Sequence, residues 1–539
     1  MAEIVKEGLA KDGAAAVYNR LKNGRNDYIT RAEDCAALTI PSLFPKDSDN
    51  SGTKYTTPWQ SIGARGINNL SAKIMLALFP VGAPFFKLNI SEMELKQMVT
   101  DPTALQDVAQ GLSMVERIVL NYMEANAYRP TLFEAIRQLI LSGNILLYVP
   151  RPDEMPEGMM AGLKAYRLSS YVVERDGFDN VLQIVTEDKI AVVALPEDLR
   201  QLVESTGVDI NENPSQEVTV YTHVYRDVES GMFKSYQEIE GEIVQGTEGE
   251  YPLDACPWIP VRLIKMPNED YGRSFVEEYL GDIKSLEALY EAMIKMSMIA
   301  AKVVFMVNPN GVTQVRRMQK ANTGDFVAGR KEDIGVFQLE KYNDFNVAKT
   351  VANDIEMRLS RAFMLNSSVQ RQGERVTAEE IRYVAGELED TLGGIYSLLG
   401  QELQMPLVSI LLSMLQATSK IPNLPKEAVE PAVATGLEAL GRGHDLDKLR
   451  MFVDYMVSLA GLQDPDLNMR DIKMRVANSL GIDTAGLILS QEEKQQLMAQ
   501  QATAQGMDAA GQAAGAAGGQ MAAQMAQQMA QQQGMPQPQ

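Results

Sequence analysis

The sequence contains few of the residues that most enzymes use for catalysis or metal binding. Among 539 residues only two are histidine, His223 and His444, and only two are cysteine, Cys35 and Cys256. Residues so scattered lack the spacing of a zinc site, and two distant cysteines do not form a disulfide framework. No Gly-Lys dipeptide and no Gly-x-Ser-x-Gly sequence occurs, which excludes a Walker A loop and a nucleophile elbow. We therefore expect no catalytic residues, no metal and no cofactor, and a protein that is not an enzyme.

The few chemical candidates that remain have simpler structural explanations. His223 lies in a predicted strand and is expected to be a half-buried sheet residue, while His444 is expected in a solvated loop. An acidic cluster lies on a predicted helix, where it is more typical of a solvated face than of a nuclease metal site. Its members are Glu387, Glu389 and Asp390. A DNA-processing nuclease remains the weaker alternative.

Basic residues are in the minority and long apolar runs are missing. The chain has 71 acidic against 50 basic residues, a net charge of −21 and a pI near 4.7. A free protein of this charge repels nucleic acid, so any handling of DNA would require enclosing it or using local basic patches. No apolar run approaches the roughly 20 residues that span a bilayer, and the N-terminus lacks a signal peptide. We expect several modules, no membrane association and a reducing cytoplasmic origin.

Two periodicities divide the first half of the chain. Residues 1–150 carry apolar positions at helical spacing in three segments, which lie at 62–78, 108–122 and 132–140. Between about 164 and 265 the period changes to two, as in Val218-Thr219-Val220. The sequence thus predicts a largely helical α+β protein with one antiparallel sheet module.

The middle of the chain predicts two long helices that bracket a small basic tip. Ser274 to Glu277 has the spacing of a helix-capping box, and the helix continues to about 300. Strands are predicted at 303–307 and 336–339, and a helix with one buried face is predicted from 345 to 365. The cations between the strands are either solubilising or able to dock an acidic partner or steer a phosphate backbone. They are Arg316, Arg317, Lys320, Arg330 and Lys331.

A charged loop at 367–375 separates that helix from another that starts near Thr377. It is either an ordinary connection or a segment that presents side chains at a fixed place. The residues of interest are Gln370, Arg371, Gln372, Glu374 and Arg375. Their mixed charge suits brief contact with a passing polyanion, because Glu374 lowers the net attraction. Further along the helix, the pair Gly393 and Gly394 is a natural point for a bend.

The C-terminal part becomes progressively simpler in composition. Prolines at 422, 425 and 431 predict short helical pieces that reach about residue 500. Beyond Asp508 no charged residue remains, and the tail consists largely of Ala, Gln, Gly and Met. This composition favours disorder in isolation, although methionines four residues apart would also allow a helical stripe that pairs with copies of itself.

Over residues 1–500 the chain resembles the portal proteins of tailed phages, in particular the head–tail connectors of short-tailed T-seven-like phages. Four runs, in family order, carry the resemblance: Ile40–Asp47 (IPSLFPKD), Gly63–Gly66 (GARG), Leu168–Val173 (LSSYVV) and Glu374–Arg382 (ERVTAEEIR). The resemblance implies a ring-forming portal fold with these parts: wing 1–270, first stem helix 271–302, clip 303–340, second stem helix 341–365, tunnel loop 366–376, long kinked wing helix 377–418, crown 419–500 and low-complexity tail 501–539.

The resemblance also implies what the protein does and what it contacts. It would line a double-stranded DNA channel at one capsid vertex, through which the genome is packaged and later ejected. Tunnel-loop residues would face DNA, and clip cations would serve docking or steering. Implied partners are eleven further copies in a ring, the terminase large subunit, tail adaptor or tail tube proteins, major capsid and scaffolding proteins, and internal core proteins. The implied place is the virion, after assembly in the bacterial cytoplasm. An internal core or scaffolding protein is the alternative.

Overall fold

The computed structural model describes residues 9, 11–50, 52–80, 84–90, 102–152, 161–194, 200, 216–300, 304–337, 342–365, 393–422, 429–433 and 454. The chain divides into two compact units, Met1–Gly441 and Arg442–Gln539. Only Asp454 of the second unit is among the described residues, so the architecture below is that of the first. The predicted pieces of residues 434–500 and the tail lie outside the described residues, apart from Asp454.

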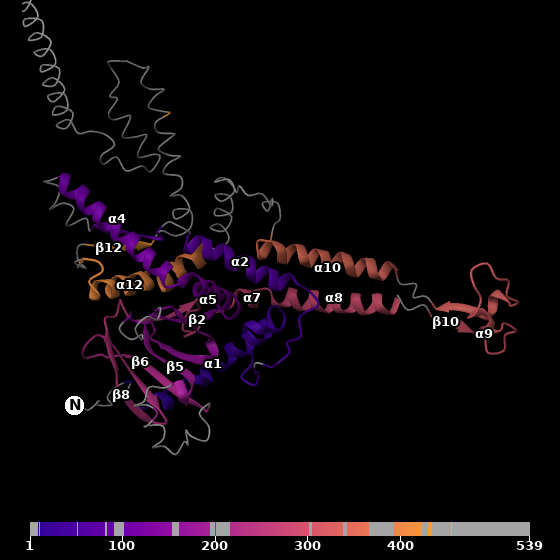
Figure 1. Cartoon of the computed structure of the whole chain (residues 1–539), viewed down its shortest axis with the longest axis horizontal. Helices are drawn as coiled ribbons and strands as arrows, with labels where there is room; N and C mark the ends of the chain where they lie inside the picture. The colour runs from indigo at the N-terminus through magenta and orange to yellow at the C-terminus, as the bar shows by residue number, and fades with distance from the viewer. Residues whose placement is uncertain are drawn as a thin grey trace, which may run out of the picture. The chain divides into compact units, whose positions relative to one another are not determined.

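The structure is a mixture of helices and antiparallel sheets, as the change of period predicts (Figure 1). The helices are α1 (Ala14–Ala37), α2 (Ile62–Leu78), α4 (Pro102–Ala125), α5 (Tyr128–Ser142), α7 (Phe275–Glu278), α8 (Leu280–Ala300), α9 (Val315–Met318), α10 (Tyr342–Ala362) and α12 (Met405–Ala417). The strands are β1 (Phe86–Ile90), β2 (Asn144–Tyr148), β3 (Lys164–Tyr166), β4 (Tyr171–Arg175), β5 (Val181–Ala191), β6 (Glu217–Arg226), β7 (Phe233–Ile239), β8 (Glu242–Tyr251), β9 (Trp258–Arg262), β10 (Val304–Val307), β11 (Ile334–Phe337) and β12 (Val429–Val433).

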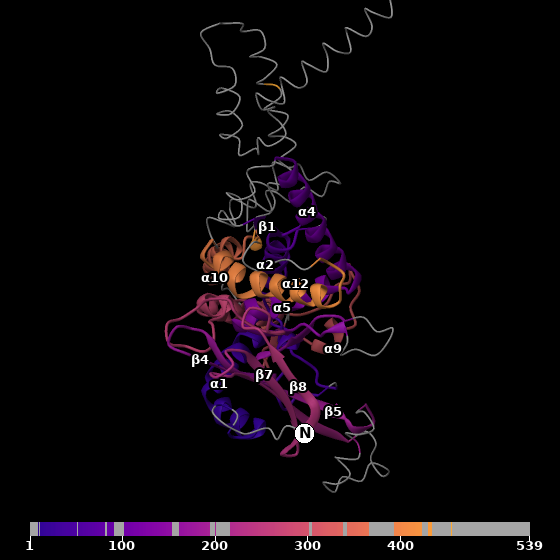
Figure 2. The ribbon, with the colours of Figure 1, turned by 90° about the vertical axis from the view of Figure 1, so that its left-hand side faces the viewer.

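Five strands form the sheet module, in the order β4-β5-β6-β7-β8, with every neighbouring pair antiparallel. In β6 the alternating residues Val218, Val220 and Val224 are buried, as the period of two predicts. Helix α1 packs on this sheet through Val17 and Tyr18, and Figure 2 shows it beside β4. Helix α1 lies in the part of the chain that was expected to be mostly helical, although it was not one of the three segments named there. Strand β2, and the separation of β3 and β9 into a second sheet with it, were not expected.

The main core lies where α2, α5 and the ends of the long helices meet. Side chains on one face of α2, including Ile67, Leu70 and Ile74, are fully buried against this core. Burial of each such side chain stabilises the fold by about 1.5–3 kcal/mol before entropy costs are subtracted. Helix α5 ends at Gly143 in a left-handed conformation, at φ 77°. A Cβ there would lie 2.7 Å from the backbone nitrogen of Ser274, so only glycine allows the chain to pass so closely.

The capping prediction at Ser274 is confirmed, but the single helix that it was expected to open is divided in two. The Ser274 hydroxyl accepts a hydrogen bond from the backbone N–H of Glu277, at 3.2 Å. Helix α7 then ends at Glu278, and α8 begins at Leu280. Helix α8 lies beside α10, as Figure 1 also shows. The two are joined by a hydrogen bond from the Tyr290 hydroxyl to Glu356, at 2.8 Å.

The predicted buried face of α10 is correct for only half of the helix. Ile355, Leu359 and Phe363 are buried, whereas Val347 is 65% and Val351 44% exposed. Apolar residues do recur every four positions along α10. In a single chain, however, only its C-terminal turns reach the core formed with α2. The N-terminal half of α10 lies beside α8, but within the described part of this chain the side chains of Val347 and Val351 stay exposed.

A second correction concerns the region after residue 418, where only helical pieces were expected. Residues Val429–Val433 form strand β12, which pairs antiparallel with β1 and places Pro431 opposite Leu88. Proline cannot donate a ladder hydrogen bond, and it is tolerated here because, among the described residues, β12 is an edge strand with β1 as its one neighbour. The strand was not predicted because a proline within a short segment argues against a strand.

Candidate functional site

The basic tip, residues 304–337, is built on a two-stranded sheet. Strands β10 and β11 pair antiparallel, with Phe305 opposite Val336 and Val307 opposite Ile334. The turn predicted after β10 is present, with the N–H of Gly311 donating to the carbonyl of Asn308 at 3.0 Å. The short helix α9 lies between the strands in sequence. Both predicted strands are thus confirmed, with ends shifted by one or two residues.

Two polar side chains provide the internal order of the tip. Thr313 and Asp333 are the only residues of 304–337 that are classed as buried in the described part of the chain, at 7% and 6% exposure. The Thr313 hydroxyl donates to Asp333 Oδ2 at 2.7 Å and accepts the N–H of Arg330 at 2.9 Å. The carbonyl of Asp333 in turn accepts the N–H of Asn308 at 2.9 Å. This pair connects the beginning of the tip to its end.

All five predicted cations lie on this tip with exposed side chains, and among the described residues none forms an ion pair. They are Arg316, Arg317, Lys320, Arg330 and Lys331. The tip carries five cationic against three acidic side chains, in a chain whose net charge is −21. It is therefore a local positive patch, the kind of surface that attracts an acidic partner or a phosphate backbone.

The candidate loop residues 370–375 lie outside the described residues, and so does the capping box predicted at Thr377. The structure does fix where that loop departs. Helix α2 holds the end of α10: Asn69 donates to the carbonyls of Phe363 and Met364 at 3.1 and 2.9 Å, and Lys73 donates to that of Met364 at 2.8 Å. A cation and an amide on the free carbonyls of a helix C-terminus stabilise that end. Phe363 and Met364, held in this way, form an anchor directly before the predicted loop.

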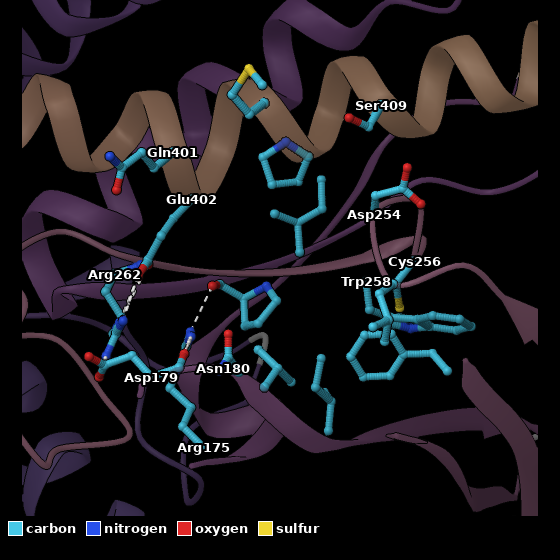
Figure 3. A pocket seen from close by; sticks show the side chains of 18 of the residues that line it. Arg175, Asp179, Asn180, Asp254, Cys256, Trp258, Arg262, Gln401, Glu402 and Ser409 are labelled. Atoms are coloured by element: carbon cyan, nitrogen blue, oxygen red, sulfur yellow. Dashed lines mark hydrogen bonds and ion pairs between the residues drawn. The ribbon is translucent and has the colours of Figure 1, made fainter. Parts of the chain in front are cut away.

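A buried ion-pair network joins the long helix Gly393–Ala417 to the sheet β3-β2-β9 (Figure 3). The Arg262 side chain is 2% exposed and forms ion pairs with Glu402 at 2.6 Å and Asp179 at 3.0 Å. The backbone N–H of Arg262 also donates to Glu402, at 2.9 Å. Nothing in the sequence analysis singled out this network, although an arginine inside the apolar run Trp258–Ile264 was a usable signal.

The long helix changes to a π-helix at Gly400–Gln404, which contains Glu402. Pro406 follows in the first turn of α12, and its missing N–H cannot donate to the carbonyl four residues earlier. The π-turn is the local adjustment to that loss. It also brings Gln404 to the end of α2, where its amide donates to the Leu78 carbonyl at 2.6 Å. The bend expected at Gly393 and Gly394 remains a prediction, because the described helix begins at Gly393.

In the described part of the chain, Gly393–Ala417 is also the one helix whose length and composition would suit a membrane span. This was not expected from the sequence, because polar residues such as Gln401, Glu402 and Gln404 interrupt the apolar run of the helix. Leu407, Val408 and Leu411 of α12 are fully buried in the main core. The apolar character of the helix is therefore used inside the fold.

A cavity of about 490 Å³ lies beside the Arg262 network, between the long helix and the sheets. Figure 3 shows Gln401 and Ser409 from the helix on one side and Cys256 and Trp258 on the other. Burial raises the pKa of Cys256 to about 12, so the thiol remains protonated at neutral pH and is a poor nucleophile. At the other end of the cavity Arg262 pairs with Asp179 and Glu402, and Lys265 pairs with Asp179.

His223 is more deeply buried than expected, at 0% exposure. Its ring nitrogens contact the Tyr236 hydroxyl at 3.0 Å and Gln183 Oε1 at 2.9 Å. Burial lowers the pKa of His223 to about 4, so it is neutral in the folded protein near neutral pH. This is a structural role. In the described residues no group of three or more His, Cys, Asp or Glu could hold a metal ion, and the acidic cluster at 387–390 lies outside them.

Comparison with known proteins identifies the family. Residues 11–488 match the family model described as bacteriophage head to tail connecting protein. The chain is 60% identical over 504 residues to the portal protein of Escherichia phage T7, which covers 93% of each chain. It is 60% identical over 511 residues to that of Enterobacteria phage T3, covering 95% of this chain and 94% of the relative. The portal protein of Pseudomonas phage phiKMV is 31% identical, covering 91% and 94%. The chain belongs to the bacteriophage head-to-tail connecting protein family.

Membership of this family confirms the resemblance noted in the sequence and gives the chain the role of a portal protein. Portal proteins are structural components of the virion at the head–tail connection, and none of these relatives is named for a catalytic activity.

Solved structures were also compared. Similar chains occur in the neck of the native GTA particle (13% identity, TM-score 0.33, 78% of this chain and 90% of that chain) and of the empty GTA particle (13%, 0.37, 79% and 90%). Because these TM-scores lie below 0.5, the family assignment rests on the sequence relatives.

Proposed function

We propose that twelve copies of this chain close into a ring whose central channel conducts double-stranded DNA during packaging and ejection. The observation that carries the proposal is the relationship to portal proteins over more than nine-tenths of the chain. A ring of identical copies needs two different, complementary surfaces on each copy, in contact head to tail. In this scheme residues 1–270 and 377–418 form the wing, 271–302 and 341–365 the stem, 303–340 the clip, 366–376 the tunnel loop and 419–500 the crown.

The half-exposed stem helices support this scheme. Val347 and Val351 on α10 and Met298 and Ile299 on α8 are between 44% and 65% exposed. Apolar side chains concentrated on adjoining helices mark a contact surface rather than a free surface. Neighbouring copies in a ring would cover them. The buried face that was predicted for all of α10 would then be complete only in the assembly.

The excess of acidic over basic residues suits a channel through which DNA must slide. DNA carries one negative charge per about 1.7 Å of its axis, so a strongly basic channel would hold it. A wall that is mostly acidic, with few cations, keeps the duplex centred and lets it slide. The net charge of −21 per copy is consistent with such a wall. The tunnel loop would supply the few direct contacts, from an anchor that Asn69 and Lys73 hold in place.

The tip would be the docking surface. Its five exposed cations face no acidic partner within the described chain, so they are available to the terminase large subunit during packaging and to tail adaptor or tail tube proteins afterwards. The wing and crown would meet the major capsid protein, scaffolding proteins and internal core proteins. Assembly would take place in the bacterial cytoplasm, before incorporation at one vertex.

Imaging the purified full chain by negative-stain electron microscopy tests the ring. We expect particles with a central hole. Rods, filaments or solid particles would contradict the proposal and favour an internal core or scaffolding protein. Divalent-metal-dependent cleavage of plasmid DNA by the pure protein would instead favour the nuclease.

Replacing Arg371 and Arg375 together with alanine tests the tunnel loop. We expect rings to form as before, because the loop leaves from an anchor that neither residue forms. Retention of packaged DNA should fall several-fold, since the two cations closest to the duplex are lost. The measurement is the DNA content of filled heads in a packaging assay. A double variant that packages and retains DNA normally would contradict the assignment.

Replacing Arg316, Arg317 and Arg330 with alanine tests the docking surface. The change removes three of five tip cations, so binding of the acidic partner should weaken at least tenfold and should depend less on salt. Pull-down of purified adaptor and terminase by assembled rings gives the measurement. Lys295→Ala on α8, another exposed cation, is the matched control. Undiminished pull-down by the triple variant would exclude this role.

A further inference from the structure

The cavity beside the Arg262 network has the size of a ligand site. Its volume of about 490 Å³ lies within the range of about 300–1,000 Å³ that small-molecule pockets occupy. Leu253, one of its lining residues, is 46% exposed, so the cavity reaches the surface of the protein. Neither the proposed channel nor the docking tip accounts for a hollow at this place.

One side of the cavity is an aromatic wall that packing holds in place. The ring of Trp258 stacks on that of Tyr148, with centroids 4.8 Å apart, and meets Tyr251 edge-on at 5.7 Å. Phe233, opposite Tyr251 in the ladder of β7 and β8, also lines the cavity. Figure 3 shows Trp258 on the side away from the Arg262 network. The cavity therefore has an apolar side and a charged side.

The charged side carries an excess of cations, although the chain as a whole has a net charge of −21. Four cations and three carboxylates line the cavity: Arg175, Arg226, Arg262 and Lys265 against Asp179, Asp254 and Glu402. Arg262 and Lys265 are both ion-paired. Arg175 and Arg226 form no ion pair with any residue that the structure describes. These two arginines are therefore the groups that an anion could neutralise.

The guanidinium group of Arg175 is held by neutral groups. It donates to the backbone carbonyls of Asp270, Asp179 and Pro260 at 3.2, 3.1 and 2.9 Å. Since arginine has five N–H donors, two remain for another acceptor. Burial lowers the pKa of Arg175, and the nearby Arg262 cation lowers it further. A bound anion would offset both effects.

Arg226 lies within reach of the same anion. It is opposite Phe233 in the ladder of β6 and β7, and both residues line the cavity. Strand β4, which ends in Arg175, and strand β6 are the two neighbours of β5. Strands two places apart are separated by about 9.5 Å, a distance that two arginine side chains can span with one anionic group between them.

We propose that this cavity binds an organic anion with an apolar body. Its anionic group would lie between Arg175 and Arg226, and its apolar part against Trp258 and Phe233. The proposal is independent of the ring, because every lining residue belongs to one chain. The ligand is either a free amphiphile, such as a fatty acid, or the neighbouring acidic and apolar side chains of a protein segment.

Other classes of ligand fit less well. A neutral apolar molecule would leave both arginines without a counter-charge. A nucleic acid would bring phosphates close to three carboxylates, and it would gain little from the apolar side. An organic anion uses both sides of the cavity, since arginine binds carboxylates and related groups through charge-assisted hydrogen bonds.

Fluorescence titration with anilinonaphthalene sulfonate, an apolar anion, tests the class of ligand. The full chain carries Trp59→Phe, so that Trp258 is its only tryptophan and energy transfer from it reports binding at the cavity. We expect saturable transfer. Phenylnaphthylamine, which has the same rings without the sulfonate, should bind at least tenfold more weakly. Equal affinities of the two probes, or no transfer to the sulfonate, would overturn the proposal.

Two substitutions place the binding. Arg226→Gln should weaken sulfonate binding about tenfold and leave phenylnaphthylamine binding unchanged, because only the charge is removed. Ser409→Phe, on the long helix, should weaken binding of both probes by filling the cavity. Arg117→Gln, at an exposed arginine of α4, is the matched control. Parental affinity of either cavity variant for the sulfonate would contradict the assignment. Arg175 is kept, because its hydrogen bonds also hold the fold together.

Displacement separates the two sources of the ligand. A free amphiphile would be released from the purified full chain by excess anilinonaphthalene sulfonate and detected as a carboxylate by mass spectrometry. A protein segment would instead block the probe, so that portal within filled heads binds less sulfonate per copy than the purified chain does. No released carboxylate together with equal binding in heads would mean that the cavity has no natural occupant, which would overturn the proposal.

Discussion

Replacing Glu402 with alanine is expected to lower the free energy of unfolding by about 3 kcal/mol, because removal of one partner leaves a buried charge uncompensated. Arg262 is 2% exposed and would keep one ion pair, with Asp179 at 3.0 Å, and one hydrogen bond, to the Glu269 carbonyl at 3.3 Å. Urea denaturation followed by tryptophan fluorescence measures the change, since Trp258 lines the adjoining cavity and one other tryptophan, the half-exposed Trp59, is present.

Two further variants make this result interpretable. Glu291→Ala removes a partner of the exposed pair with Lys295 and should change stability by no more than about 0.5 kcal/mol. Arg262→Met combined with Glu402→Leu should recover much of the lost stability, because apolar side chains of similar volume often replace a buried ion pair without loss. A Glu402→Ala protein within 1 kcal/mol of the parent would show that the network does not join the long helix to the sheet.

Gly143→Ala is expected to have an effect of similar size or larger. The substitution forces alanine into the left-handed region, at a cost of about 1–2 kcal/mol. It also places a Cβ 2.7 Å from the backbone nitrogen of Ser274, which caps α7. Backbone atoms cannot rotate away as a side chain does, so α5 and the start of α7 must separate. Thermal unfolding of the full chain provides the measurement.

Gly231→Ala separates the two contributions. Gly231 has a similar φ of 67°, but a Cβ there would meet nothing within 4 Å. It should therefore show the conformational cost of about 1–2 kcal/mol alone. Equal losses for the two variants would mean that the close approach of α5 to Ser274 contributes nothing.

Local signals in the sequence predicted local structure well. The Ser274 cap, the alternation in β6 and the strands that frame the basic tip all depend on residues close together in the chain. What failed depended on distant partners. Pro431 hid β12, whose pairing with β1 joins residues more than 300 positions apart. Arg262 and Glu402 are 140 residues apart, and Glu402 lies in a π-turn that no local signal predicts.

The candidate site was predictable only in part, for a related reason. The tip cations could be found from their concentration in an acidic chain. Whether Val347 and Val351 are buried could not, because their spacing reports an apolar face without saying whether the same chain or another one covers it. Helical periodicity predicts that a face is a contact surface, but it does not show which chain supplies the contact.

The π-turn at Gly400–Gln404 also shifts the angular positions, around the helix axis, of the residues before it relative to those after it. A π-turn takes up one residue more than the corresponding α-turn, and one residue corresponds to a rotation of about 100°. A helical wheel that is correct for Leu407 and Leu411 is therefore out of phase by that angle for the described residues 393–399, which precede the π-turn. The face of the helix on which each residue of 393–399 lies is thus set by the phase of this single turn, and deletion of one residue within the turn would rotate all of them about the axis without changing any of their side chains.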